Sequence, residues 1–287
     1  MNGIKNILVF LILVVISFSQ ISSLHASDKK PKKIQKKKIN VSLFSVSQKI
    51  NDTKTDEDFY DAKLNVAWRW MPLMVDVREA KISHNDAVDS MNRFTNQLWD
   101  FMEARIKSKK TRKYSVEDWV FPVKGYTPNA IGGSNGSGYI SSGFDFFEIN
   151  SGGHPAHDVF IDDNDQDCLD DETGNPVKIL SMSGGIVVET RKDWTTERMD
   201  IKGGNIVYVY DNYTNGFFYY AHLKDVNVNV GELVKPGLVL GTMGRTGKNA
   251  YPSRSPTHLH IMYVRSFDGD LRPENIYPDL VKAKVIQ

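Results

Sequence analysis

The sequence predicts a mainly β fold, an antiparallel β-sheet domain preceded by a helical segment. From Trp119 onward, short runs of β-prone residues alternate with Gly, Asn and Asp turns, which is typical of short antiparallel strands. Over residues 56–113, apolar side chains recur at three- and four-residue spacing instead, which favours helices. The chain has 287 residues and 40% hydrophobic content, enough apolar material for one or two packed domains.

Residues 1–26 have the pattern of a cleavable signal peptide. Lys5 precedes the twelve-residue apolar run Ile7–Phe18, and the small residue Ala26 stands at a suitable cleavage point. A membrane-spanning helix needs about 20 apolar residues, so an uncleaved anchor is the less favoured alternative. In both cases we expect export, to the periplasm, the cell envelope or the extracellular space.

Residues 27–55 form the expected Lys-rich linker. Seven of the ten residues of Lys29–Lys38 are lysine. Behind a signal peptide, this run predicts either a solvated tether with weak attraction to anionic envelope polymers or a membrane surface, or a linker without a partner. Residues 119–287 carry 15 Lys and Arg against 21 Asp and Glu, so no nucleic-acid partner is expected. The single cysteine, Cys168, excludes an intrachain disulfide.

Residues 56–118 form the expected helical N-terminal region. Ser83 has the position of an N-cap, with Asp86 as an acid at the third helical position. A looser pattern over Asp58–Val77 predicts an earlier helix that Pro72 ends or kinks. We find no catalytic chemistry here, and an inhibitory, gating or partner-binding role stays open. The apolar face of the later helix consists of Ala87, Met91, Phe94, Leu98 and Met102.

The rest of the chain, residues 119–287, forms the expected β domain. Its β-prone runs are short and separated by turn residues, as in antiparallel sheets. The predicted strands are Ile186–Thr190, Asn205–Tyr210, Phe217–His222, Val226–Val230, Leu238–Gly241 and Leu259–Val264.

Histidines cluster in three short segments of this β domain. Residues two apart on a strand point to the same face, so His258 and His260 can face one site. His154 and Asp158 lie four residues apart at a turn into a strand. Two imidazoles and one carboxylate can hold Zn²⁺ and leave its fourth position open to water, as in catalytic zinc sites. The clustered histidines are His154, His157, His222, His258 and His260.

The motifs around these histidines occur in a specific order. They are His154-Pro155-Ala156-His157-Asp158, Tyr220-Ala221-His222-Leu223, the hairpin Val228–Gly241 followed by Gly244-Arg245-Thr246-Gly247, and His258-Leu259-His260. With the opening segment Phe121-Pro122-Val123, this series resembles the M23 family of zinc metallopeptidases, the lysostaphin-like peptidoglycan endopeptidases. The resemblance covers roughly Trp119–Val264 and implies an antiparallel β-sheet catalytic domain of the M23 (lysostaphin-like) type.

By position, the resemblance implies that His154, Asp158 and His260 bind one zinc ion. It implies that His222 and His258 are unligated catalytic histidines. One would accept the proton of a zinc-bound water, and the other would stabilise the oxyanion or protonate the leaving amine. The implied function is a secreted zinc metalloendopeptidase that hydrolyses peptide cross-links of bacterial peptidoglycan, or another peptide substrate.

The alternative function is a non-catalytic cell-wall-binding or hydrolase-activating module on the same fold. The sequence leaves open which bond is cut, which free histidine is the general base, and the oligomeric state.

Two features depart from the family pattern. His157 is an extra histidine beside Asp158, and strand alternation predicts that it faces away from the site; a substitute ligand or a supporting donor is the alternative. An acidic loop, Ile161–Glu172, carries aspartates at alternating positions, as calcium loops do. Because Cys168 and Gly174 replace the glycine and glutamate that calcium loops need, we expect a solvated loop rather than a calcium site.

Overall fold

The computed structural model describes residues 66–148 and 151–287. The expected signal peptide (1–26) and Lys-rich linker (27–55) lie outside the described residues, as does the start of the helical region (56–65). No helix among the described residues is long and apolar enough to cross a membrane.

The α-helices are α4 (Trp70–Arg78), α5 (His84–Lys107) and α6 (Tyr277–Lys282). The strands are β1 (Ala156–Phe160), β2 (Lys178–Leu180), β3 (Gly185–Arg191), β4 (Asn205–Asp211), β5 (Gly216–Leu223), β6 (Leu233–Val234), β7 (Val239–Thr242), β8 (His258–Phe267) and β9 (Asp270–Pro273).

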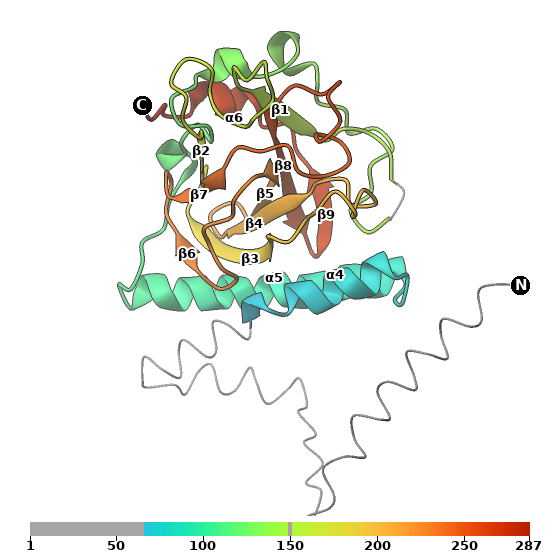
Figure 1. Cartoon of the computed structure of the whole chain (residues 1–287). Coiled ribbons are helices and arrows are strands. Elements are labelled where there is room, and N and C mark those ends of the chain that lie inside the picture. Colours follow the sequence, from blue (N-terminus) through green and yellow to red (C-terminus); the bar gives the residue numbers. More distant parts are fainter. Residues whose placement is uncertain (1–65, 149–150) are drawn as a thin grey trace, which may run out of the picture. The chain divides into compact units, whose positions relative to one another are not determined.

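The main sheet of the described chain has seven strands, in the order β1-β8-β5-β4-β3-β6, and β9 pairs with the second half of β8 (Figure 1). Every pairing in it is antiparallel. Strands β2 and β7 form a separate two-stranded sheet. The predicted antiparallel, mainly β fold is therefore confirmed.

Five of the six predicted strands form, and the strand expected over Val226–Val230 is wrong. Only an isolated bridge from Val226 to Gly241 exists there. A turn interrupts the segment, because the Asn229 N–H donates to Glu232 Oε2 and the Glu232 N–H donates back to the Asn229 carbonyl, both at 3.1 Å. The valines at 228 and 230 are buried from this loop, so their alternation reflects burial without strand pairing.

Helix α5 begins and packs as predicted. The Ser83 hydroxyl accepts the Asp86 N–H at 3.2 Å and so caps the helix. Arg105 and Lys107 lie in the last turn, where cations favour the helix C-terminus. All members of the predicted apolar face are buried: Ala87, Met91, Phe94, Leu98 and Met102.

Helix α4 differs from the prediction around Pro72. Residues 66–67 are helical, residues 68–69 form a turn, and α4 begins at Trp70, two residues before the proline. Pro72 therefore lies in the first turn, where a backbone N–H would have no intrahelical partner and a proline is tolerated. The predicted break is real but falls a few residues earlier.

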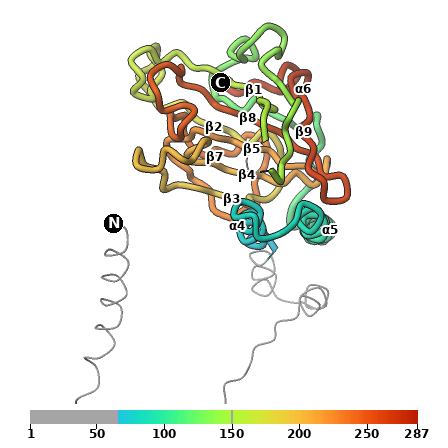
Figure 2. Tube along the Cα trace, turned by 90° about the vertical axis from the view of Figure 1, so that its right-hand side faces the viewer, coloured from blue at the N-terminus to red at the C-terminus, as the bar shows by residue number. Residues whose placement is uncertain are grey.

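The two faces of the sheet bury different hydrophobic clusters. On β8, Leu259 and Ile261 point into one cluster, whereas Met262 and Val264 point into the other. Helices α4 and α5 belong to the second cluster. They lie next to each other along one side of the sheet (Figure 2), with α4 on β3 and α5 on β8 and β9.

Trp70 anchors α4 to the face of the sheet on which the two helices pack. Its side chain is fully buried, and its Nε1–H donates to Glu189 Oε2 on β3 at 2.6 Å. The helices and the sheet therefore share one core. Four aromatic rings lie within 6.0 Å of the indole, namely Phe94, Phe146, Tyr208 and Phe217.

Candidate metal centre and catalytic site

The candidate site lies where β1 and β8 pair. Asp158 on β1 lies directly opposite His260 on β8. His258 precedes His260 by two residues and so shares its face, and His154 lies just before β1. His222 lies near the end of β5, the strand on the other side of β8. The structure thus brings together all five residues that the sequence singled out.

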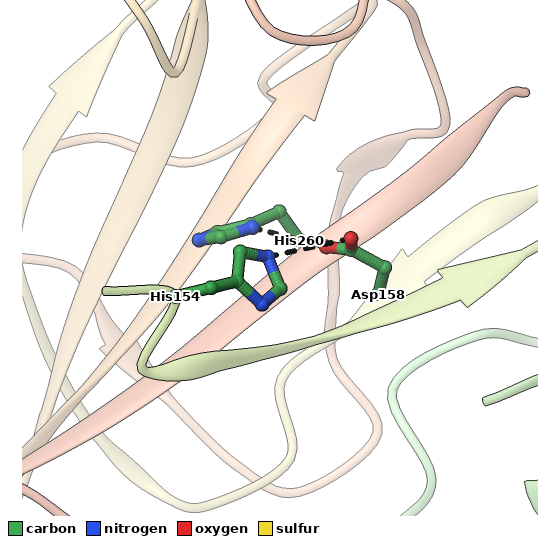
Figure 3. A group of neighbouring side chains, drawn as sticks. All are labelled: His154, Asp158 and His260. Atoms are coloured by element: carbon green, nitrogen blue, oxygen red, sulfur yellow. Dashed lines mark hydrogen bonds and ion pairs between the residues drawn. The ribbon is translucent and has the colours of Figure 1, made fainter. Parts of the chain in front are cut away.

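Three of these side chains form a group that fits a metal ion. One donor atom from each of His154, Asp158 and His260 lies within 4.8 Å of the other two. Asp158 joins the two imidazoles, with Oδ2 at 3.3 Å from His154 Nε2 and Oδ1 at 3.0 Å from His260 Nδ1 (Figure 3). Two imidazole nitrogens and one carboxylate are a donor set of catalytic zinc sites. The residues therefore fit a single zinc ion.

Backbone carbonyls orient two of the imidazoles. Nδ1 of His154 lies 2.8 Å from the Gly138 carbonyl oxygen, and Nδ1 of His258 lies 2.8 Å from that of Pro256. When Nδ1–H donates to a carbonyl, Nε2 carries the free lone pair and its direction is fixed. Nε2 of His258 lies 3.7 Å from Asp158 Oδ1, so this free nitrogen faces the metal-binding group.

His222 takes an unusual backbone conformation that aims its ring at the same place. Its φ of +67° lies in the left-handed region, which non-glycine residues rarely adopt. Its Nδ1 lies 2.8 Å from the Thr246 carbonyl. Thr246 can come this close because Gly204 has no side chain; a Cβ there would lie 2.3 Å from Thr246 Oγ1. The His222 ring lies 4.9 Å from that of His258 and 5.8 Å from that of His260.

The electrostatic environment separates the roles of these groups. Burial, helped by the neighbouring His260 and His258 rings, lowers the pKa of His222 to about 3. Burial also lowers the pKa of His258. Burial alone would raise the pKa of Asp158, but hydrogen bonds from His154 and His260 outweigh it and hold that pKa well below its usual range. At neutral pH the site therefore offers one carboxylate and two neutral imidazoles that can accept a proton.

A buried hydrogen-bond chain supports the backbone next to His258. The Thr257 hydroxyl donates to Asp163 Oδ2 at 2.6 Å, and Arg245 Nη1 donates to the Thr257 hydroxyl at 3.0 Å. All three side chains are buried. Sequence reasoning missed this chain, and the expectation of a solvated loop is wrong for Asp163. The sequence feature that could have indicated this chain is Thr257, the residue before the His-x-His motif.

The acidic loop is held by its own backbone. The carboxylates of Asp163, Asp165 and Asp171 come within 4.8 Å of one another. Asp163, however, already accepts the backbone N–H groups of Asp167 and Cys168 at 3.1 and 3.0 Å. These contacts explain the loop conformation without a cation.

His157 turns away from the site, as strand alternation predicts. It is buried, its Nε2 lies 2.9 Å from Asn275 Oδ1, and its ring stacks on Tyr139 at 5.7 Å. It does not belong to the group of donors that could share a metal.

A pocket of about 370 Å³ opens beside the metal-binding group. The rings of His154, His222 and His260 line it together with Tyr208 and Tyr219. The rings of His154, His222 and His260 are therefore accessible to a ligand from this pocket.

Comparison with known proteins finds similarity to peptidases over part of the chain. Residues 169–270 match the model of Peptidase family M23. Over 135 residues the chain is 33% identical to the glycyl-glycine endopeptidase ALE-1 of Staphylococcus capitis, covering 47% of this chain and 31% of that protein. Over 122 residues it is 33% identical to lysostaphin of Staphylococcus simulans, covering 42% of this chain and 20% of that protein. The chain thus spans a third or less of the length of these curated relatives.

A solved structure similar to this chain is the catalytic domain of lysostaphin from Staphylococcus simulans. The two share 25% identity over 50% of this chain and 90% of that one, with a TM-score of 0.34.

The family match contains only part of the candidate site. His222, His258 and His260 lie within residues 169–270, whereas His154 and Asp158 come before them. The pairing of β1 with β8 brings these two parts of the site together.

Proposed function

We propose that this chain, in which residues 169–270 belong to peptidase family M23, is an exported zinc metalloendopeptidase that hydrolyses peptide cross-links of bacterial peptidoglycan. One observation carries the proposal. A group of three metal donors and two further neutral imidazoles meet at one place on the sheet, beside an open pocket. This is the set of groups that metal-assisted hydrolysis of an amide requires.

In this proposal His154, Asp158 and His260 hold the zinc ion. The carboxylate of Asp158 is already anionic at neutral pH, because its pKa is low, so no proton has to leave it on binding. The Gly138 carbonyl holds the His154 ring in place. When bound, zinc would supply Lewis-acid activation of water and of the scissile carbonyl.

His258 and His222 act on protons in this proposal. Both rings present Nε2 to the site, because each Nδ1 lies 2.8 Å from a backbone carbonyl oxygen. Burial keeps both neutral at pH 7, so one can accept the proton of the attacking water. The other can stabilise the developing oxyanion or pass a proton to the leaving amine.

The rival function, a non-catalytic wall-binding or hydrolase-activating module, is less well supported. Such a module has no need for metal donors or for free imidazoles beside them. In this chain both sets are present, and hydrogen bonds to backbone carbonyls hold His154, His222 and His258. The signal-peptide pattern of residues 1–26 supports the export that the proposal needs.

Mass spectrometry of the fragments released from purified peptidoglycan tests the proposed function. The full chain, loaded with zinc, would be incubated with one peptidoglycan that has glycine cross-bridges and with one that is directly cross-linked. We expect new cross-link cleavage products from at least one of them, and their masses identify the bond.

Three controls accompany this experiment. A chelated sample should release no products, and the His258→Ala protein should release them at least about 100-fold more slowly. The His157→Gln protein should remain active, because His157 faces away from the site. Release of the same products by the His258→Ala protein at the wild-type rate, or no release by folded, zinc-bound protein, would reject the proposed function.

A further inference from the structure

Helix α4 forms part of the wall of the pocket beside the candidate site. Met74, Val77 and Arg78 line the pocket together with the site histidines. Met74 and Val77 are buried, whereas the Arg78 side chain is 42% exposed. A helix that precedes the β domain in the sequence therefore contributes a cation to the pocket.

Glu189 holds Arg78 in position. Nη2 of Arg78 donates to the two carboxylate oxygens of Glu189 at 3.1 and 3.3 Å. Glu189 is fully buried and also accepts hydrogen bonds from Trp70 at 2.6 Å and from Arg191 at 3.4 Å. The Glu189 carboxylate thus faces the guanidinium groups of both Arg78 and Arg191. These three side chains together carry a net positive charge.

The Arg78 guanidinium has donors left for a ligand. Only Nη2 has a hydrogen-bond partner among the described residues. A guanidinium carries five N–H donors in a fixed fork, which matches the two oxygens of a carboxylate. Arg78 is therefore a fixed, partly exposed cation with its Nε and Nη1 groups unused.

Two tyrosine rings lie between Arg78 and the site histidines. The Tyr219 ring lies 6.0 Å from that of His260, and the Tyr208 ring lies 4.6 Å from that of Tyr219. Tyr208 lies opposite Glu189, the hydrogen-bond partner of Arg78, in the pairing of β3 with β4. The two rings lie on β4 and β5, the strands between β3, which carries Glu189, and β8, which carries His260.

The other charged side chains that line the pocket lie outside α4. They are Asp145, Glu148 and Lys202. Asp145 is already engaged by His84 Nε2 at 3.0 Å. Glu148 belongs to the segment that leads to His154, and Lys202 belongs to the segment before β4. Lys202 therefore offers a matched control, because it is a second cation in the same pocket on a different element.

We infer that Arg78 binds a carboxylate of the peptide substrate, and that α4 is a fixed part of the substrate site. This rests on the proposed peptidase function and specifies its substrate class. The ligand is a peptide with a free carboxylate, such as the α-carboxylate of glutamate in a peptidoglycan stem. Because Trp70 and Glu189 hold α4 on the sheet, the cation is in place before the substrate arrives.

Isothermal titration calorimetry on the full chain tests this inference with two peptides. Both have the stem sequence L-Ala–γ-D-Glu–L-Lys–D-Ala; one has a free α-carboxylate on D-Glu and the other a carboxamide. We expect the wild-type protein to bind the carboxylate peptide about tenfold more tightly, because a charge-assisted hydrogen bond is lost in the amide. Arg78→Gln should reduce this preference to less than about twofold. Arg78→Lys should keep part of it, and Lys202→Gln should keep it in full.

The outcomes separate the inference from the proposed function. Equal binding of the two peptides by the wild-type protein, or an unchanged preference in the Arg78→Gln protein, would overturn the inference while leaving the peptidase function intact. A variant that only loses stability weakens both peptides equally, so the ratio stays unchanged and again contradicts the inference. If the wild-type protein neither binds these peptides nor cleaves peptidoglycan, the proposed function fails with it.

Discussion

Two regions on the same face of the sheet differ in what they bury. Where β1 pairs with β8, the side chains of His154, Asp158 and His260 are polar and keep 34%, 25% and 18% of their surface exposed. Farther along the face, where α4 and α5 pack, Trp70 and Phe217 are fully buried. The helix-covered region contributes apolar burial and therefore stability, whereas the open region keeps donor atoms free for a ligand.

The difference predicts that activity and stability can be changed separately. A substitution in the open region removes a donor or a proton acceptor and leaves the apolar core intact. A substitution under the helices removes core contacts and leaves the imidazoles in place. Glu189 is the exception, because this buried carboxylate both anchors α4 and positions Arg78 in the pocket.

The largest effect is expected for the two histidines outside the metal-binding group. His258→Ala and His222→Ala should each lower kcat by about 10²- to 10⁴-fold, the usual contribution of a positioned acid or base. Because both rings are buried and each is hydrogen-bonded to a backbone carbonyl, the free energy of unfolding should fall by about 1–3 kcal/mol, less than for truncation of the buried Trp70. Steady-state rates on a cleaved peptide, with thermal unfolding alongside, check this. Comparable losses of stability and activity would break the separation of the two regions.

A large loss of stability is expected in the helix-covered region. Trp70→Ala should lower the free energy of unfolding by about 3–5 kcal/mol, the usual effect of truncating a buried tryptophan. Denaturant unfolding measures this change. Trp68→Ala is the matched control, because Trp68 is 53% exposed and should change stability by less than about 0.5 kcal/mol. Equal effects of the two substitutions would contradict the shared core of helices and sheet.

A smaller, pH-dependent effect is expected for Asp211 at the end of β4. Burial raises the pKa of Asp211 to about 6, above that of an unfolded aspartate, about 3.9. The folded state therefore binds this proton more tightly, and the stability contributed is present at low pH and lost as the pH rises from about 4 to 6. Asp211→Asn should remove about 3 kcal/mol of this pH dependence. Unfolding curves of both proteins across this pH range should converge at pH 4; identical pH profiles would argue against a raised pKa.

The smallest effect is expected for the buried chain that supports His258. Thr257→Val keeps the shape of the side chain but leaves Arg245 and Asp163 without their shared hydroxyl. We expect kcat to fall about tenfold with KM almost unchanged. Ser253→Ala, an exposed change nearby, should be neutral. A change in KM alone would show that Thr257 does not position His258.

Local periodicity predicted much of this molecule. The three- and four-residue spacing after Ser83 identified α5 and its buried face, and His-x-His spacing identified two site residues on one strand face. Long-range contacts could not be predicted in this way. The bond from Trp70 to Glu189 joins residues 119 positions apart, and that from Thr257 to Asp163 spans 94 positions. Only the folded sheet creates them. The failure of the predicted Val226–Val230 strand has a different, local cause, the turn between Asn229 and Glu232.

The most direct test of the central claim is the zinc content of three purified full-length proteins after dialysis, measured by inductively coupled plasma mass spectrometry. The proposed division of the site predicts one zinc ion per chain in the wild-type protein and in the His258→Ala protein, and none in the Asp158→Ala protein. Loss of zinc from the His258→Ala protein, or full zinc occupancy in the Asp158→Ala protein, would contradict the assignment of His154, Asp158 and His260 as the ligands.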